Sequence, residues 1–166
     1  MAHGVVRTDK MAGTDNRAFM RSVRYAVSAT PTDIDNGNVV LMGALENGSR
    51  EVYTATAPLA NSPLKDIALV ASPEVMYDER KKNLDEFYNE AGKIARGYAL
   101  HTGDIFSVTK DALDGAATPA VGNVVELKAG TKLNVVATAT EGSTVVGKII
   151  DKNIVGRYTY FAIQVA

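Results

Sequence analysis

The chain of 166 residues contains no cysteine. This absence excludes disulfide bridges, thiolate zinc sites and cysteine nucleophiles together. Only two histidines are present, His3 and His101, so a metal site built from several histidines is excluded as well. The sequence therefore gives no support to the catalytic and metal chemistries that depend on these side chains.

Long apolar runs are also missing. No stretch reaches the roughly 18 apolar residues that a membrane-spanning helix needs. The first residues, "MAHGVVRTDKMAGTDNRAFM", lack the apolar centre of a signal peptide. We therefore expect a protein made in the cytoplasm that has no membrane partner.

Charge is nearly balanced over the whole chain, with a net value of −1, but it is unevenly distributed. Residues 1–30 hold five basic and two acidic side chains, a surplus of +3, which leaves −4 on the remainder. A nucleic-acid-binding protein normally presents a basic face, and this composition does not predict one. The pattern indicates a basic N-terminal segment on an acidic body.

Residues 1–22 show neither helical nor alternating periodicity, and alternation typical of a strand begins in "RSVRYAVSAT", residues 21–30. We predict that residues 1–30 form an extended arm that leads into the first strand and binds another surface. Its apolar anchors and its basic side chains would make the contacts. These are Val5, Val6, Met11, Phe19 and Met20, and Arg7, Arg17, Arg21 and Arg24.

Residues 31–166 have the pattern of a β-rich body. Several short apolar runs are separated by turn residues, and Asn47-Gly48 lies between two of them, which is a strong hairpin signal that favours a type I′ turn. The last run, "GRYTYFAIQV", alternates most clearly and is expected to pair inside a sheet. The spacing predicts a mainly β (α+β) fold, an antiparallel barrel or sandwich with one short helix and the N-terminal arm.

The helix is expected between about Asp78 and Ala91. In this stretch Leu84, Phe87, Tyr88 and Ala91 recur at spacings of three and four residues. The segment "KDALDGAATPAVG" is expected to be a long surface loop because it is rich in Gly, Ala and Pro. A subdivision of the body is therefore possible near residues 115–122.

Three stretches contain some of the side chains that a metal site or a catalytic site requires. "DIDNGN" resembles half of a calcium loop, but Gly37 is fifth instead of sixth and position twelve is Ala44 instead of glutamate. "HTGD" places His101 near Asp104, without the partners of a nucleophilic relay. Asp85, Glu86 and Glu90 are interpreted as a solvated face. We expect no enzyme, no cofactor and no metal.

Four phrases carry a resemblance to a known group of proteins. They are "VVRTDKMAGT", "GNVVLMGALENGSREVYTATAP", "LVASPEVMYDERKKNLDEFYNEAG" and "ARGYALHTGDIFSVTKDALDG", which together span roughly residues 5–115. They are similar to small structural proteins of tailed bacteriophages from the head-gene region beside the major capsid protein. The later phrase "VGNVVELKAGTKLNVVATATEGSTVVGKIID" resembles the β-barrel portion of such proteins.

The resemblance implies a capsid decoration (cement) protein or the base of a head fibre, assembled in the host cytoplasm and carried on the capsid surface of the virion. It implies the major capsid protein as partner, with self-association, for which a trimer is expected, and without nucleic acid. Two alternatives stay open. One is a tail-tube or head-completion protein, and the other is a glycan-binding module with Tyr158 and Tyr160 as an aromatic platform.

Overall fold

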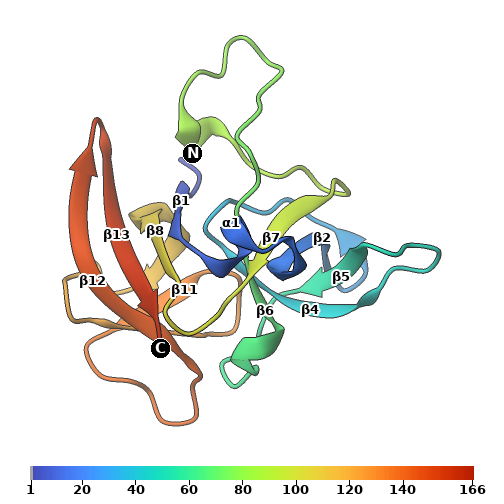
Figure 1. Cartoon of the computed structure of the whole chain (residues 1–166). Coiled ribbons are helices and arrows are strands. Elements are labelled where there is room, and N and C mark those ends of the chain that lie inside the picture. Colours follow the sequence, from blue (N-terminus) through green and yellow to red (C-terminus); the bar gives the residue numbers. More distant parts are fainter. Residues whose placement is uncertain (1) are drawn as a thin grey trace.

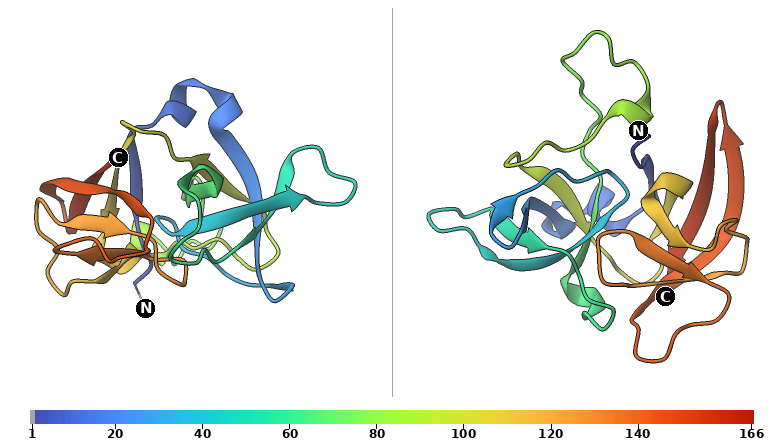
Figure 2. Two further views of the ribbon diagram at one scale, coloured as in Figure 1. Left: turned by 90° about the horizontal axis from the view of Figure 1, so that it is seen from below. Right: turned by 180° about the vertical axis from the view of Figure 1, so that it is seen from behind.

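The computed structural model describes residues 2–166 and is mainly β. Two units lie side by side, a closed five-stranded barrel and a curled seven-stranded sheet (Figures 1 and 2). The predicted mainly β class is confirmed. No helix within the described residues has the length and apolar character to cross a membrane.

The barrel is built from the first half of the chain. Its strands, in order around the ring, are β2 (Met20–Val27), β5 (Val52–Thr56), β4 (Val39–Leu45), β6 (Ile67–Val70) and β7 (Ala95–Ala99). The ring closes because β7 pairs with β2, and β2–β5 is its one parallel pairing. The short β3 (Thr30–Pro31) lies outside the ring and pairs antiparallel with the end of β2.

The seven-stranded sheet joins both ends of the chain. Its order is β1 (Val6–Lys10), β8 (Ile105–Thr109), β13 (Tyr158–Val165), β12 (Val145–Val155), β10 (Val124–Glu126), β11 (Leu133–Val136) and β9 (Leu113–Gly115). The last strand of the chain is therefore paired on both sides, as predicted. The subdivision considered near residues 115–122 is wrong, because that stretch connects two strands of this one sheet.

The main core lies between the two units. Strand β6 is buried on both faces, as its unbroken apolar run predicts: Ala68 and Val70 point into the barrel, while Ile67 and Leu69 join the main core. Phe106 of the curled sheet belongs to that same core and is fully buried. Because the barrel and the sheet share one core, each supports the other.

The helix predicted between Asp78 and Ala91 is wrong. Residues 71–94 connect β6 to β7 with one short 3₁₀ turn, η3 (Leu84–Glu86), and the one α-helix within the described residues is α1 (Ala12–Asp15). Further 3₁₀ turns are η1 (Arg17–Phe19), η2 (Leu64–Asp66) and η4 (Lys110–Ala112). Ala112 and Leu113 are buried, so the predicted loop begins only after β9.

The two Asn-Gly pairs have different roles. Asn47-Gly48 is the tip of the β4–β5 hairpin, as predicted, although only Gly48 of the pair has a positive φ, of 78°, so the turn is not type I′. Gly37 has φ 83° and is buried, and a Cβ there would lie 2.8 Å from the Cβ of Ala112. Asn36-Gly37 is therefore part of the interior.

We expect Gly37→Ala to lower the free energy of unfolding by about 2–4 kcal/mol, since a left-handed backbone and a steric clash act together. The matched control is Gly48→Ala, where the φ is similar and no atom lies within 4 Å of the added Cβ. That control should lose only about 1 kcal/mol. Urea denaturation of both variants measures the difference, and equal losses would contradict the packing argument.

Candidate functional site

The predicted anchors of the N-terminal arm are part of this chain's own fold. Val5, Val6 and Met11 are buried, with exposed fractions of 2%, 8% and 1%. Strand β1 pairs antiparallel with β8, and the N–H of Thr109 donates to the carbonyl of Val5 at 3.0 Å. The free arm predicted for residues 1–30 is therefore wrong, because Val6 and Met11 belong to the main core and β1 is a strand of the curled sheet.

Two of the predicted basic contacts also have internal partners. Arg7 lies 3.5 Å from the carboxylate of Asp9 and stacks over the ring of Tyr160. The guanidinium of Arg24 lies 3.2 Å from the carboxylate of Glu46. These arginines serve the fold itself.

The remaining predicted residues lie close to one another on the surface. Phe19 packs against His101, with ring centroids 4.0 Å apart and the ring planes tilted by 44°. Arg17, Met20 and Arg21 line one wall of a large surface groove. The structure thus brings together three of the nine predicted residues and separates them from the others.

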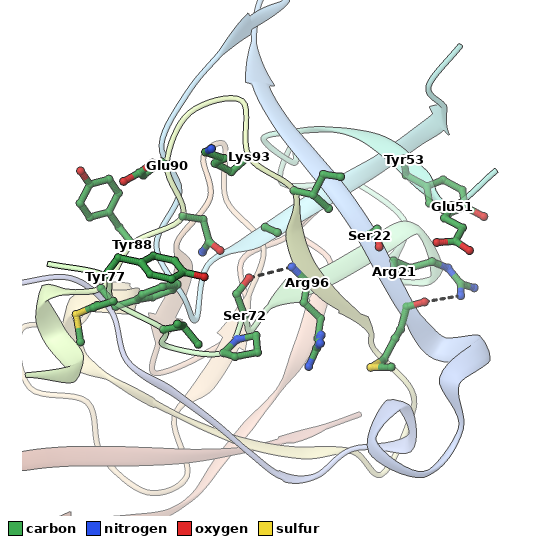
Figure 3. Close-up of a pocket in the computed structure, with 18 of the residues that line it drawn as sticks. Arg21, Ser22, Glu51, Tyr53, Ser72, Tyr77, Tyr88, Glu90, Lys93 and Arg96 are labelled. Atoms are coloured by element: carbon green, nitrogen blue, oxygen red, sulfur yellow. Dashed lines mark hydrogen bonds between the residues drawn. The ribbon is translucent and has the colours of Figure 1, made fainter. Parts of the chain in front are cut away.

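We call this depression the basic groove. It encloses about 1380 Å³ and is formed by three separated parts of the chain, residues 17–22, 50–53 and 72–96. Figure 3 shows Tyr77 and Tyr88 on one side, Tyr53 and Arg21 on the other, and Arg96 between them. No motif or periodicity in the sequence predicts the contributions of residues 50–53 and 72–96 to this groove.

Cations without ion pairs dominate the groove. Arg17, Arg50, Lys93 and Arg96 form no salt bridge with any residue in 2–166. Among the lining carboxylates, that of Asp78 is already paired with Arg80 at 2.9 Å. The groove therefore carries an uncompensated positive charge within an acidic body.

The carboxylate of Glu86 also has partners, but these are backbone groups and not a cation. It accepts hydrogen bonds from the backbone N–H groups of Asn83 and Lys82, each at 2.8 Å. These bonds lower the pKa of Glu86, and the bond from Asn83 has the largest effect. Glu86 thus caps the η3 turn and stays ionised. Glu51 and Glu90 are further acidic side chains of the groove, and neither forms an ion pair with any residue in 2–166.

The outer wall of the groove, residues 72–94, is held at several points although it has little regular structure. The amide of Asn36, 1% exposed, bonds to both backbone groups of Ser72, at 2.8 and 3.0 Å, and accepts from Asn89 at 3.1 Å. At the far end, Asp85 pairs with Arg157 at 2.9 Å and accepts from the Tyr158 hydroxyl at 2.8 Å. The wall is anchored to both the barrel region and the β12–β13 hairpin.

The acidic side chains of the stretches that resemble a metal or catalytic site form hydrogen bonds or ion pairs within the fold. Asp104 is 5% exposed and accepts from the backbone N–H groups of His101 and Ala12, at 2.9 and 2.8 Å, so "HTGD" is a hydrogen-bonded corner. In "DIDNGN", Asp33 accepts from the Ala91 N–H at 2.6 Å and Asp35 lies 2.7 Å from His3. Within residues 2–166, no three acidic or histidine side chains gather as a metal site would require.

One acidic side chain is deeply buried. Glu126 is 1% exposed and accepts hydrogen bonds from Asn134 and from the backbone and hydroxyl of Thr140, at 2.8–2.9 Å. Burial raises the pKa of this carboxyl, but the hydrogen bonds from Thr140 and Asn134 together lower it below its ordinary value. The group is fully satisfied and fastens the loop after β11 to the sheet.

The aromatic pair behind the glycan alternative is not an exposed platform. Tyr160 is 4% exposed and lies beneath Arg7, and burial raises its pKa. Tyr158 is half-buried, and its hydroxyl is bound to Asp85. The pair therefore does not form the exposed aromatic platform that the glycan alternative requires.

Comparison of the chain with protein-family models, with curated proteins and with solved structures gave no match. The function is therefore argued from the residues and from the geometry of the basic groove.

We expect Met11→Ala to lower the free energy of unfolding by about 2–4 kcal/mol, because it leaves a cavity in the main core. The control Arg17→Ala removes an exposed side chain nearby and should change stability by less than about 0.5 kcal/mol. Urea denaturation measures both. If Met11→Ala is as stable as the wild type, residues 5–11 are not part of the core and the free arm would have to be reconsidered.

Proposed function

We propose that this chain is a structural protein of a tailed-bacteriophage head that binds the outside of the capsid and stabilises the junctions between capsomers. The observation that carries the proposal is the basic groove. Arginine and tyrosine are among the side chains most enriched in the energetically important parts of protein interfaces. Both line this groove, and its arginines form no ion pair within the described residues. The resemblance of residues 5–115 to phage head proteins supplies the partner, the major capsid protein.

The architecture supports a binding role because the groove is pre-organised. Its inner wall is part of a closed barrel, and its outer wall is tied down through Asn36 and Asp85. A surface that is ordered before binding loses little conformational entropy when a partner docks. The interaction energy is then available to hold two neighbouring subunits together.

The mechanism is physical. As packaged DNA pressurises a head, a protein that spans adjacent capsomers adds buried surface where they would separate. Many weakly bound copies act together through the symmetry of the shell, and a trimer at local three-fold positions fits this scheme. Arg17 and Arg21, which lie in the groove, keep the role of pairing with capsid carboxylates that was predicted for the arm.

One observation favours the rival role of a tail-tube or head-completion protein. The second half of β12 pairs only with β13, and Ile150, Ile154 and Val155 are exposed on the hairpin that projects from the sheet (Figure 1). An unpaired strand edge with exposed apolar side chains is suited to association between copies. Rings or tubes formed by the purified protein would support this role.

Co-sedimentation with phage heads tests the proposed function. Purified wild-type protein should sediment with heads that lack it, and should raise the temperature at which those heads release DNA. Heads already saturated with the protein are the control and should take up no more. Failure to sediment with the heads, combined with ring or tube formation by the protein alone, would contradict the decoration role.

A further inference from the structure

We infer that the basic groove receives an extended, acidic polypeptide segment, which adds as a strand to residues 74–79. The inference deepens the proposed function and rests on it in taking the segment from the capsid protein. Three features of the described residues carry it: an unpaired stretch of backbone, exposed apolar side chains beside it, and an excess of free cations facing it.

The backbone of residues 74–79 has the features of a strand that lacks a partner. Its side chains alternate between exposed and half-buried positions, with Val75 and Tyr77 exposed by 58% and 95%. Neither the N–H nor the carbonyl of Met76 or Tyr77 forms a hydrogen bond within residues 2–166. Such a stretch can form backbone hydrogen bonds with an added strand.

The side chains around this stretch define what fits there. Val75, Tyr77 and Ile94 expose apolar surface in the same groove. Apolar contacts from alternate residues of an added strand would cover this surface, which water now surrounds. The partner is therefore expected to carry apolar side chains at every second position.

The positive charge of the groove determines which side chains fit at the other positions of the added strand. Arg50, Lys93 and Arg96 face the groove from three different elements and form no ion pair within the described residues. Arginine pairs well with carboxylates, which it can bind through two parallel hydrogen bonds. Aspartate or glutamate between the apolar residues of the partner would satisfy all three cations.

A polypeptide fits this groove better than a nucleic acid does. The N–H and carbonyl groups of Met76 and Tyr77, which have no partner within the described residues, match the alternating donors and acceptors of a peptide backbone. A phosphate backbone offers acceptors only.

Charge reversal tests the inference. The groove variant is Arg50→Glu with Lys93→Glu and Arg96→Glu, and the matched control is Lys65→Glu with Lys132→Glu and Lys148→Glu. All six side chains are exposed, and the control lysines lie outside the groove. Each variant changes the net charge equally, so a difference between them reports position and not overall charge.

The first arm of the experiment uses a labelled peptide of alternating glutamate and valine, followed by fluorescence anisotropy. Wild type and control should bind it, and the groove variant should bind more than about tenfold more weakly, a change of about 1.4 kcal/mol. Equal binding by all three proteins, or no binding by the wild type, would overturn the inference. Tighter binding of an oligothymidylate than of the peptide would overturn the choice of a polypeptide.

The second arm uses phage heads and amide hydrogen exchange read by mass spectrometry. On heads, the amides of residues 74–79 should gain protection, and the groove variant alone should fail to sediment. If the wild type binds heads with no added protection at residues 74–79, the inference fails while the proposed function stands. If the wild type binds the peptide but not the heads, the proposed function fails and the groove assignment stands.

Discussion

The hydrogen bonds of the Asn36 side-chain amide are the interactions on which the basic groove depends. The amide is buried, and it forms two hydrogen bonds with the backbone of Ser72 and one with the side chain of Asn89. Asn89 also donates to the carbonyl of Ile34, and the two backbones form a bridge there. A buried amide without partners would cost about 1–3 kcal/mol per unsatisfied group, so these three segments are fixed relative to one another.

These hydrogen bonds determine where the outer wall of the basic groove lies. Ser72 and Asn89 lie near the two ends of its outer wall, and the Ser72 hydroxyl accepts from the N–H of Arg96 at 2.9 Å. A single buried side chain therefore sets the path of a long irregular segment and the position of β7 beside it. The neighbouring Gly37 permits this arrangement, because its positive φ lets the chain turn against Ala112 without a side chain in the way.

The β fold is predictable from the sequence where local pattern and burial agree. Alternation in β2 and β13, and Asn-Gly between β4 and β5, were sufficient to place those strands. Strand β1 was missed because it is a short edge strand with only Val6 buried, and its partner β8 lies about a hundred residues further along the chain. The lack of local periodicity in this segment predicts a free arm, but long-range pairing with β8 orders it.

The helix prediction failed for a different physical reason. Residues 78–91 have helix-forming composition, yet Glu86 is used to cap a single 3₁₀ turn and Asn89 pairs with Ile34. Tertiary contacts override weak helical propensity. The groove could not be predicted either, since its walls come from three parts of the chain that only the fold brings together.

Amide hydrogen exchange of the free wild-type protein, resolved by residue with NMR, tests this account most directly. If Asn36 fixes the outer wall, the amides of Ser72 and Asn89 should exchange as slowly as that of Leu69 in β6. The amide of Tyr77, which has no partner within the described residues, should exchange fast. Exchange at Ser72 and Asn89 as fast as at Tyr77 would contradict a fixed wall and, with it, a pre-organised groove.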